Sequence, residues 1–219
     1  RRPAETIFEH GTDRSLFTPS IEIFESIMAV RKPARLKRYF PTYILRILLD
    51  ECAIRGWADM TRYLLGLRTP PGVQLWSKHN CKCLKYASRG GFADIVRLLL
   101  DHGCPTEGAL VAAATHGHMV IIRMLLDYGV ETKLALAGAA RGGYIQAVRL
   151  LLDSGADVNE GFPSAIVHAV ELEHTTIFEL LIERGADLTS AGSREEAMRR
   201  AKLAGLESMA AQLAEYGVE

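Results

Sequence analysis

The chain has 219 residues, of which 48% are hydrophobic and 24% charged, and its 26 Lys and Arg residues balance its 26 Asp and Glu residues. A formal net charge of zero excludes a general electrostatic attraction to nucleic acid or to a membrane surface. No apolar run reaches the roughly 20 residues that cross a bilayer, and Arg1 is not followed by a signal-peptide core. Four cysteines are too few for a disulfide framework, which favours a reduced, cytoplasmic or nuclear location.

The N-terminal part of the sequence lacks a clear repeat. Residues 1–18 show no hydrophobic period, so we expect a flexible N-terminal segment there, followed by a helical cap at residues 19–40. Residues 31–38 carry five positive charges. The favoured interpretation is a solvated edge of the cap, and the alternative is a nuclear localisation patch or a nucleic-acid contact. The absence of Met at residue 1 favours a piece of a longer protein.

From residue 84 onward the sequence repeats itself. The glycines at the centre of three copies, Gly91, Gly117 and Gly143, are 26 residues apart. Each has a large apolar residue seven positions before it, an alanine four positions before it, and an apolar stripe with helical spacing after it. The stripes read Ile95, Val96, Leu99 and Leu100; Ile121, Ile122, Leu125 and Leu126; Val148, Leu151 and Leu152; and Ile177, Phe178, Leu181 and Ile182. This period predicts a stack of two-helix units.

Extending the same frame predicts one repeat domain over residues 41–219, with six units. They lie near residues 41–68, 80–103, 107–129, 133–155, 163–185 and 194–217. The first unit is degenerate, and the fifth has Glu173 where a turn glycine is expected. The second helix of the last unit is polar, which is typical of a terminal unit whose outer side meets water.

Two segments carry a family resemblance. Residues 110–118 read Leu-Val-Ala-Ala-Ala-Thr-His-Gly-His, and residues 150–159 end in Gly-Ala-Asp-Val-Asn. Both resemble the ankyrin repeat, which implies an all-α solenoid of about six helix-turn-helix units. The units that start at Leu110 and Leu136 are about seven residues shorter than the family repeat. The missing stretch corresponds to the family's projecting β-hairpin, so we expect tight loops and few or no hairpins.

The resemblance also implies a function. Ankyrin repeats typically serve as protein-interaction modules, so we predict no enzyme activity, no cofactor, no small-molecule substrate and no membrane association. Residues just before the turn glycines are expected on the concave side, where they contact another protein. Because Arg pairs well with carboxylates, our hypothesis is that they bind an acidic segment of that protein. The predicted contact residues are Tyr86, Arg89, Thr115, His116, Arg141, His168 and Glu171. Two alternative functions stay open. The chain could be a regulatory part of a larger enzyme or transcription regulator, or, less favoured, it could contact nucleic acid through residues 31–38.

Other polar groups suggest chemistry less strongly. His79, Cys81 and Cys83, with Cys104, could form a soft metal site, but the spacing is not that of paired zinc ligands. His116 and His118 near Cys104 lack a third group to orient a nucleophile. We therefore predict neither metal ligands nor catalytic residues. The aromatic residues Trp57, Phe92 and Tyr144, which follow turn glycines, are expected to serve packing.

Overall fold

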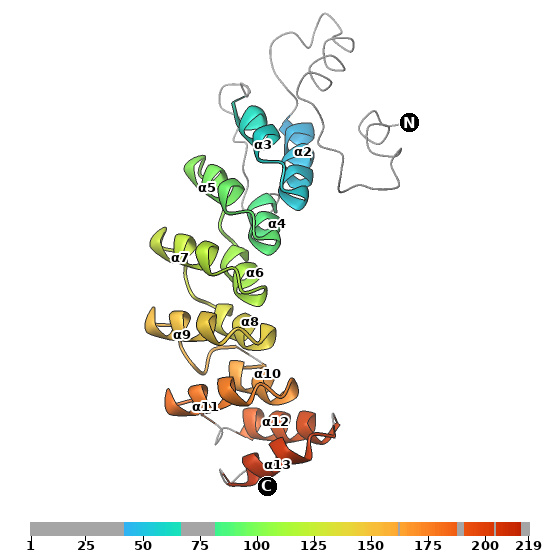
Figure 1. Cartoon of the computed structure of the whole chain (residues 1–219), viewed down its shortest axis with the longest axis vertical. Helices are drawn as coiled ribbons and strands as arrows, with labels where there is room; N and C mark the ends of the chain where they lie inside the picture. The colour runs from blue at the N-terminus through green and yellow to red at the C-terminus, as the bar shows by residue number, and fades with distance from the viewer. Residues whose placement is uncertain (1–41, 67–81, 162, 188–190, 204, 216–219) are drawn as a thin grey trace, which may run out of the picture.

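The computed structural model describes residues 42–66, 82–161, 163–187, 191–203 and 205–215. Its helices alternate between an inner and an outer row (Figure 1). The inner helices are α2 (Thr42–Arg55), α4 (Cys83–Gly90), α6 (Ala109–Thr115), α8 (Ala135–Gly142), α10 (Ala165–Glu171) and α12 (Ala191–Leu203). The outer helices are α3 (Ala58–Leu65), α5 (Ala93–Asp101), α7 (Met119–Asp127), α9 (Ile145–Asp153), α11 (Thr175–Glu183) and α13 (Glu207–Glu215).

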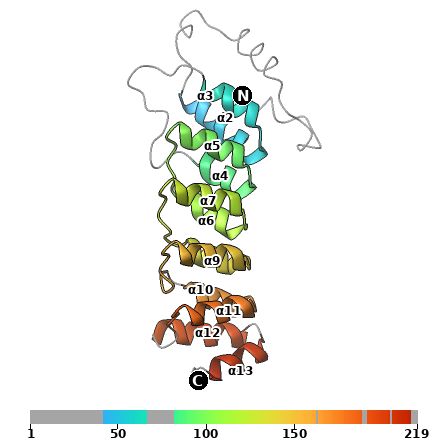
Figure 2. The ribbon, with the colours of Figure 1, turned by 60° about the vertical axis from the view of Figure 1, so that its left-hand side comes forward.

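Each inner helix pairs with the outer helix that follows it, and the pairs stack into an elongated molecule (Figure 2). The inner helices pack on one another more closely than the outer helices do. Figure 1 shows the inner row bowed, with α2 and α12 to the right of α6 and α8, so the inner helices line the concave side. The predicted all-α solenoid of six units is confirmed, and the described residues contain no β-strand.

A continuous apolar core runs through the stack. The predicted apolar and alanine positions of the inner helices are buried, as Leu84, Ala87 and Leu110 illustrate. From the outer helices, every position of each stripe except the last is also buried, and the last positions Leu126, Leu152 and Ile182 are only half-buried, unlike Leu100. Because each unit buries its apolar faces only against its neighbours, the stability of the chain is a sum of unit and interface terms.

In the second to fifth units, the residue after the turn position packs on the turn glycine of the preceding unit. A Cβ added to Gly91 would lie 2.7 Å from Cε1 of His118, and His174 covers Gly143 in the same way. Both glycines also have positive φ, so two separate constraints require glycine there. The aromatic residues Phe92 and Tyr144 cover the turn glycines of the units before them, which confirms that they serve packing.

The links between the shortened units are tight turns, as predicted. The backbone N–H of Ala109 donates to the carbonyl of Thr106, and that of Ala135 donates to the carbonyl of Thr132. Four residues therefore suffice to start each inner helix where the family has a hairpin. In the fifth unit, Glu173 keeps the left-handed conformation of the turn glycine that it replaces, with φ of 54°.

Several predictions fall on residues outside the described part of the chain. These are the flexible segment at residues 1–18, the helical cap at 19–40 and the basic patch at 31–38. The degenerate first unit is present as α2 and α3. Its inner helix has 14 residues, whereas α4, α6, α8 and α10 have seven or eight.

Candidate partner-binding face

Three inner helices of the shortened units present one surface on the concave side. Side chains spaced i, i+3 or i+4, and i+7 share one face of a helix, so α4, α6 and α8 each expose a stripe that faces away from the outer helices. We call this surface the inner face, defined by the following residues: Lys82, Lys85, Tyr86 and Arg89; Gly108, Val111, Ala112, Thr115 and His116; and Leu134, Ala137, Gly138 and Arg141.

The centre of the inner face is small and apolar. Ala112 and Ala137 expose less than a tenth of their surface, and Gly138 has no side chain. A Cβ added to Gly138 would lie 2.7 Å from Oγ1 of Thr115, so this glycine lets α8 approach α6 closely. We call these small, buried residues the floor of the inner face; Gly138 itself is covered by α6, and larger side chains from α4 and α8 lie on either side.

The two polar residues that were predicted on α6 bond to their own helix. Oγ1 of Thr115 donates to the carbonyl of Val111 at 2.7 Å, and Nδ1 of His116 lies 3.0 Å from the carbonyl of Ala112. Thr115 and His116 stay half-exposed beside the floor. They can contact a partner chiefly through the Thr115 methyl group and the His116 ring.

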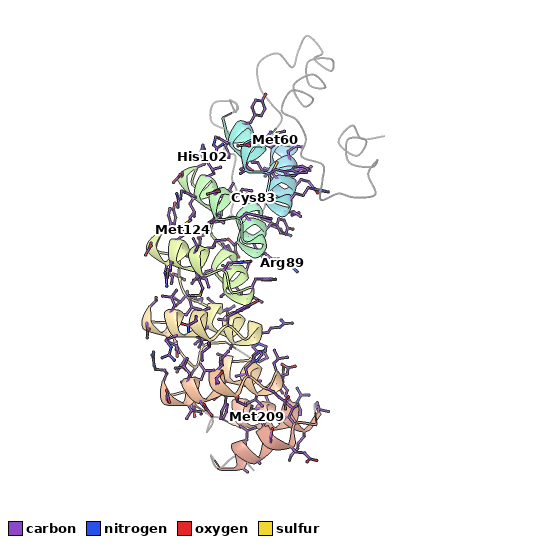
Figure 3. All side chains as sticks on the ribbon, in the orientation of Figure 1. Met60, Cys83, Arg89, His102, Met124 and Met209 are labelled. Atoms are coloured by element: carbon purple, nitrogen blue, oxygen red, sulfur yellow. The ribbon has the colours of Figure 1, made fainter. Side chains whose placement is uncertain are left out.

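Arg89 and Arg141 are exposed, two units apart along the stack. Figure 3 shows Arg89 on the side of the inner helices, opposite His102 and Met124. Neither guanidinium forms a salt bridge with any residue that the structure describes. Nε2 of His118 lies 3.0 Å from the carbonyl of Arg89, which ties that turn to the next unit.

Two further cations lie on the inner face, and sequence reasoning missed them. Lys82 and Lys85 share the exposed stripe of α4 with Arg89, and they too lack a salt bridge with the described residues. The methylene stem of Lys85 lies over Gly108, with Cδ 3.4 Å from the position of an added Cβ. The spacing of residues 82, 85 and 89 was the available signal, because it places all three on one helical face.

The inner helices toward the C-terminus carry charges that pair with one another. Arg200 on α12 contacts Glu171 on α10, and its Nε donates to Oε1 of Glu196 at 2.6 Å. A second arginine, Arg199, pairs with Glu196 at 2.6 Å. Glu171, one of the predicted contact residues, is therefore already bound within the chain, which reduces what it can offer a partner.

His168 is the remaining predicted contact residue, and it is half-buried beside this network. Burial lowers the pKa of His168 below 6.5, the nearby Arg200 and Arg141 lower it further, and Glu171 opposes the shift. At neutral pH the imidazole is therefore uncharged. Its Nδ1 lies 3.6 Å from Oε2 of Glu171, which is longer than a hydrogen bond.

The described thiols belong to the core. Burial raises the pKa of Cys52 to about 12, which makes that thiol unreactive at neutral pH. The Sγ atoms of Cys83 and Cys104 are both buried and lie 3.5 Å apart. No group of three or more metal-ligating side chains occurs among the described residues. His79 and Cys81, the other members of the metal hypothesis, lie outside them.

Comparisons with known proteins agree with this geometry. Residues 105–162 match the family model described as Ankyrin repeats (3 copies). The crystal structure of the human ASB11 ankyrin repeat domain has a similar fold, with a TM-score of 0.60 and 20% sequence identity, and the match covers 78% of this chain and 84% of that chain. A search of curated proteins finds no match to the sequence.

Residues 105–162 are therefore ankyrin repeats, and the described chain has the ankyrin-repeat fold. The sequence match lies on the shortened units, and the shared fold extends over most of the stack. Ankyrin repeats generally act as protein-interaction modules, which favours a protein as the class of partner. Within the described residues, no helix combines the length and the apolar character needed to span a membrane.

Proposed function

We propose that the chain is a non-enzymatic interaction module that binds an acidic segment of a partner protein across its inner face. Arg89 and Arg141 bind carboxylates of that segment, and Tyr86, Thr115 and His116 contact its remaining atoms. His168 and Glu171 border the bound segment without holding it, because Glu171 is engaged by Arg200.

The observation that carries the proposal is the contrast between unpaired and paired cations on one row of helices. Lys82, Lys85, Arg89 and Arg141 are exposed and lack salt bridges with the described residues, whereas Arg200 is neutralised by two carboxylates. A guanidinium that is not engaged within the chain can form a bidentate bond to a partner carboxylate. Arginine and tyrosine are also the residue types that often dominate interface energies.

The small floor between the cations favours an apolar contribution from the partner. Ala112 and Ala137 have small side chains beside the half-buried Val111, so a large apolar side chain of a partner can pack against them. Burying one large apolar side chain contributes about 1.5–3 kcal/mol. The expected segment therefore combines Asp or Glu with at least one large apolar residue.

A peptide selection tests the proposal. Short random peptides displayed on phage are selected on the purified chain, and the most enriched peptide is synthesised with a fluorescent label for anisotropy titrations. We expect the peptide to contain acidic residues and its affinity to fall as the salt concentration rises. In the double variant Arg89→Glu and Arg141→Glu, the Kd should rise tenfold or more, which corresponds to about 1.4 kcal/mol.

The chain offers a matched control. Arg97 and Arg149 are also exposed, also lack a salt bridge with the described residues and also lie two units apart, but they belong to the outer helices α5 and α9. Reversing both of these charges should leave the Kd unchanged. An enriched peptide without acidic residues, or equal losses in the two double variants, would contradict the proposal.

A further inference from the structure

Two buried thiols are in contact at the boundary between the second and third units. Cys83 is the first residue of α4, and Cys104 lies in the link from α5 to α6. Their Sγ atoms lie 3.5 Å apart, although the residues are 21 positions apart in the sequence. Neither residue exposes more than 3% of its surface. The contact therefore joins the start of one inner helix to the link that leads into the next.

The fold does not require cysteine at either position. The backbone N–H of Cys104 donates to the carbonyl of Leu99, and in the next three units the same bond is made by Val130, Ala156 and Ala186. The residues equivalent to Cys83, each the first of its inner helix, are Ala109, Ala135 and Ala165. Small apolar side chains fill both positions in those units. In the second unit both positions hold a thiol, and the two thiols touch.

The two sulfurs are close enough to bond after a small movement. A disulfide bond is about 2.05 Å long, so the sulfurs need to approach each other by about 1.5 Å. Rotation about the two Cα–Cβ bonds moves the sulfurs without moving the helices. A bond between residues this far apart in the sequence restricts the unfolded chain, and it therefore stabilises the folded one.

We propose that Cys83 and Cys104 form a reversible redox latch, which closes into a disulfide under hydrogen peroxide and opens again with a thiol reductant. The closed latch fixes the start of α4 to the link before α6. It thereby stabilises the boundary between the second and third units. This inference does not depend on the proposed binding of an acidic segment.

The reaction begins at Cys104, because the link can open while the helices stay folded. Cys104 follows the exposed residues His102 and Gly103 and lies between two helices rather than within one. Local opening of such a segment costs less than unfolding a helix. Hydrogen peroxide converts the Cys104 thiol to a sulfenic acid and releases one water. When the link recloses, the Cys83 sulfur attacks the Cys104 sulfur, and the displaced hydroxide leaves with the Cys83 proton as a second water.

Disulfide mapping tests the latch. The reduced, folded chain is treated with hydrogen peroxide, its remaining thiols are blocked with N-ethylmaleimide, and tryptic peptides are analysed by mass spectrometry. Trypsin places the four cysteines on separate peptides, which are residues 47–55, 79–82, 83–85 and 98–123. We expect peptide 83–85 to be linked to peptide 98–123, with the loss of two hydrogen atoms. Dithiothreitol should release both peptides by thiol–disulfide exchange.

Thermal unfolding gives a second readout. The oxidised chain should have a Tm about 5 °C above that of the reduced chain. Cys83→Ala and Cys104→Ala should abolish both the linked peptides and this gain, and alanine suits both sites because it occupies equivalent positions. The matched control is Cys52→Ala, since the residues equivalent to Cys52 are Ala87, Ala113 and Ala139. Cys52→Ala and Cys81→Ser should keep both the link and the gain.

Three results would overturn the inference. If Cys83 and Cys104 stay reduced in the folded chain while the chain unfolded in urea forms disulfides, burial shields the pair completely. If Cys81 replaces Cys83 in the linked peptides, the latch is assigned to the wrong pair. If the expected bond forms but lowers the Tm, it distorts the core, and the pair serves only packing.

Discussion

The shortened units, α4 to α9, and the C-terminal units, α10 to α13, bury the same kind of apolar core. They differ in whether the charged side chains of their inner helices pair within the chain. In both regions the inner and outer helices bury apolar stripes of the same register. In the shortened units Arg89 and Arg141 are exposed without a salt bridge to the described residues. In the C-terminal units Glu171, Glu196 and Arg200 form one network between α10 and α12.

The difference separates residues that stabilise the stack from residues that are available to a partner. Charges that pair within the chain have less to offer another molecule, and they contribute modestly to stability at the surface. An exposed charge without a partner in the chain adds little to folding stability and can pair with another molecule. Four measurements test this difference between the two regions.

Cavities in the core should have the largest effect, and the effect should be larger in the middle of the stack than at its end. Replacing Leu125 by Ala should lower the free energy of unfolding by about 2–5 kcal/mol. Leu213→Ala, an equally buried position in α13, should lower it less, because the last unit has one neighbour and can unfold by itself. Urea denaturation measures both, and equal losses would show that the units do not behave as a linear stack.

Removing a single buried hydroxyl should have the next largest effect on the free energy of unfolding. Ser88 is fully buried on α4 and its Oγ has no hydrogen-bond partner among the described residues, while the equivalent positions are Ala114 and Ala140. Because an unsatisfied buried hydroxyl costs about 1–3 kcal/mol, Ser88→Ala should raise the free energy of unfolding by roughly 1 kcal/mol. Thermal denaturation measures the gain, and a loss of stability would mean that the hydroxyl is satisfied in solution.

Neutralising one arginine in each region compares their charges directly. Arg200→Met should lower the free energy of unfolding by less than about 1 kcal/mol, because solvent screens the network. Its effect should shrink at high salt concentration. Arg141→Met should change stability by no more than about 0.5 kcal/mol in either direction. If Arg141→Met proves the more destabilising, the assignment of paired and unpaired regions is wrong.

The smallest effect concerns pH. The pKa of His168 is lowered in the folded chain by burial, so the unfolded chain binds its proton more readily. This neutral form stabilises the fold above about pH 6.5, and that stabilisation is lost as the pH falls through the lowered pKa. Between about pH 7.5 and 5.5 the natural chain should therefore lose more Tm than His168→Gln, in which the other histidines remain. Parallel losses in the two proteins would remove His168 as the cause.

The repeat frame allowed most of the fold to be predicted. The spacing of Leu84, Ala87 and Gly91, copied in later units, placed both helices of each unit and the glycine turn between them. The half-buried Leu126 and Leu152 were not predicted, since periodicity gives the direction of a side chain and not how completely its neighbours cover it.

The candidate site could be predicted in part. Register alone put Arg89 and Arg141 on the same surface as Tyr86, because equivalent residues of stacked units form rows. The same register gave no sign that Glu171 pairs with Arg200, which lies 29 residues further along the chain. Nor did it reveal that Leu134 has a positive φ, because the sequence does not state φ.

Local sequence patterns were enough to predict the two-helix unit, its repetition along the described residues, the shortened links and most side chains of the core. These features follow from local periodicity and from turn chemistry, which act over a few residues. The packing of the units against one another settles which charges find partners, which glycines admit a neighbouring helix and which leucine has a positive φ. Those outcomes depend on distances between units, and such distances exist only after the units have packed against one another.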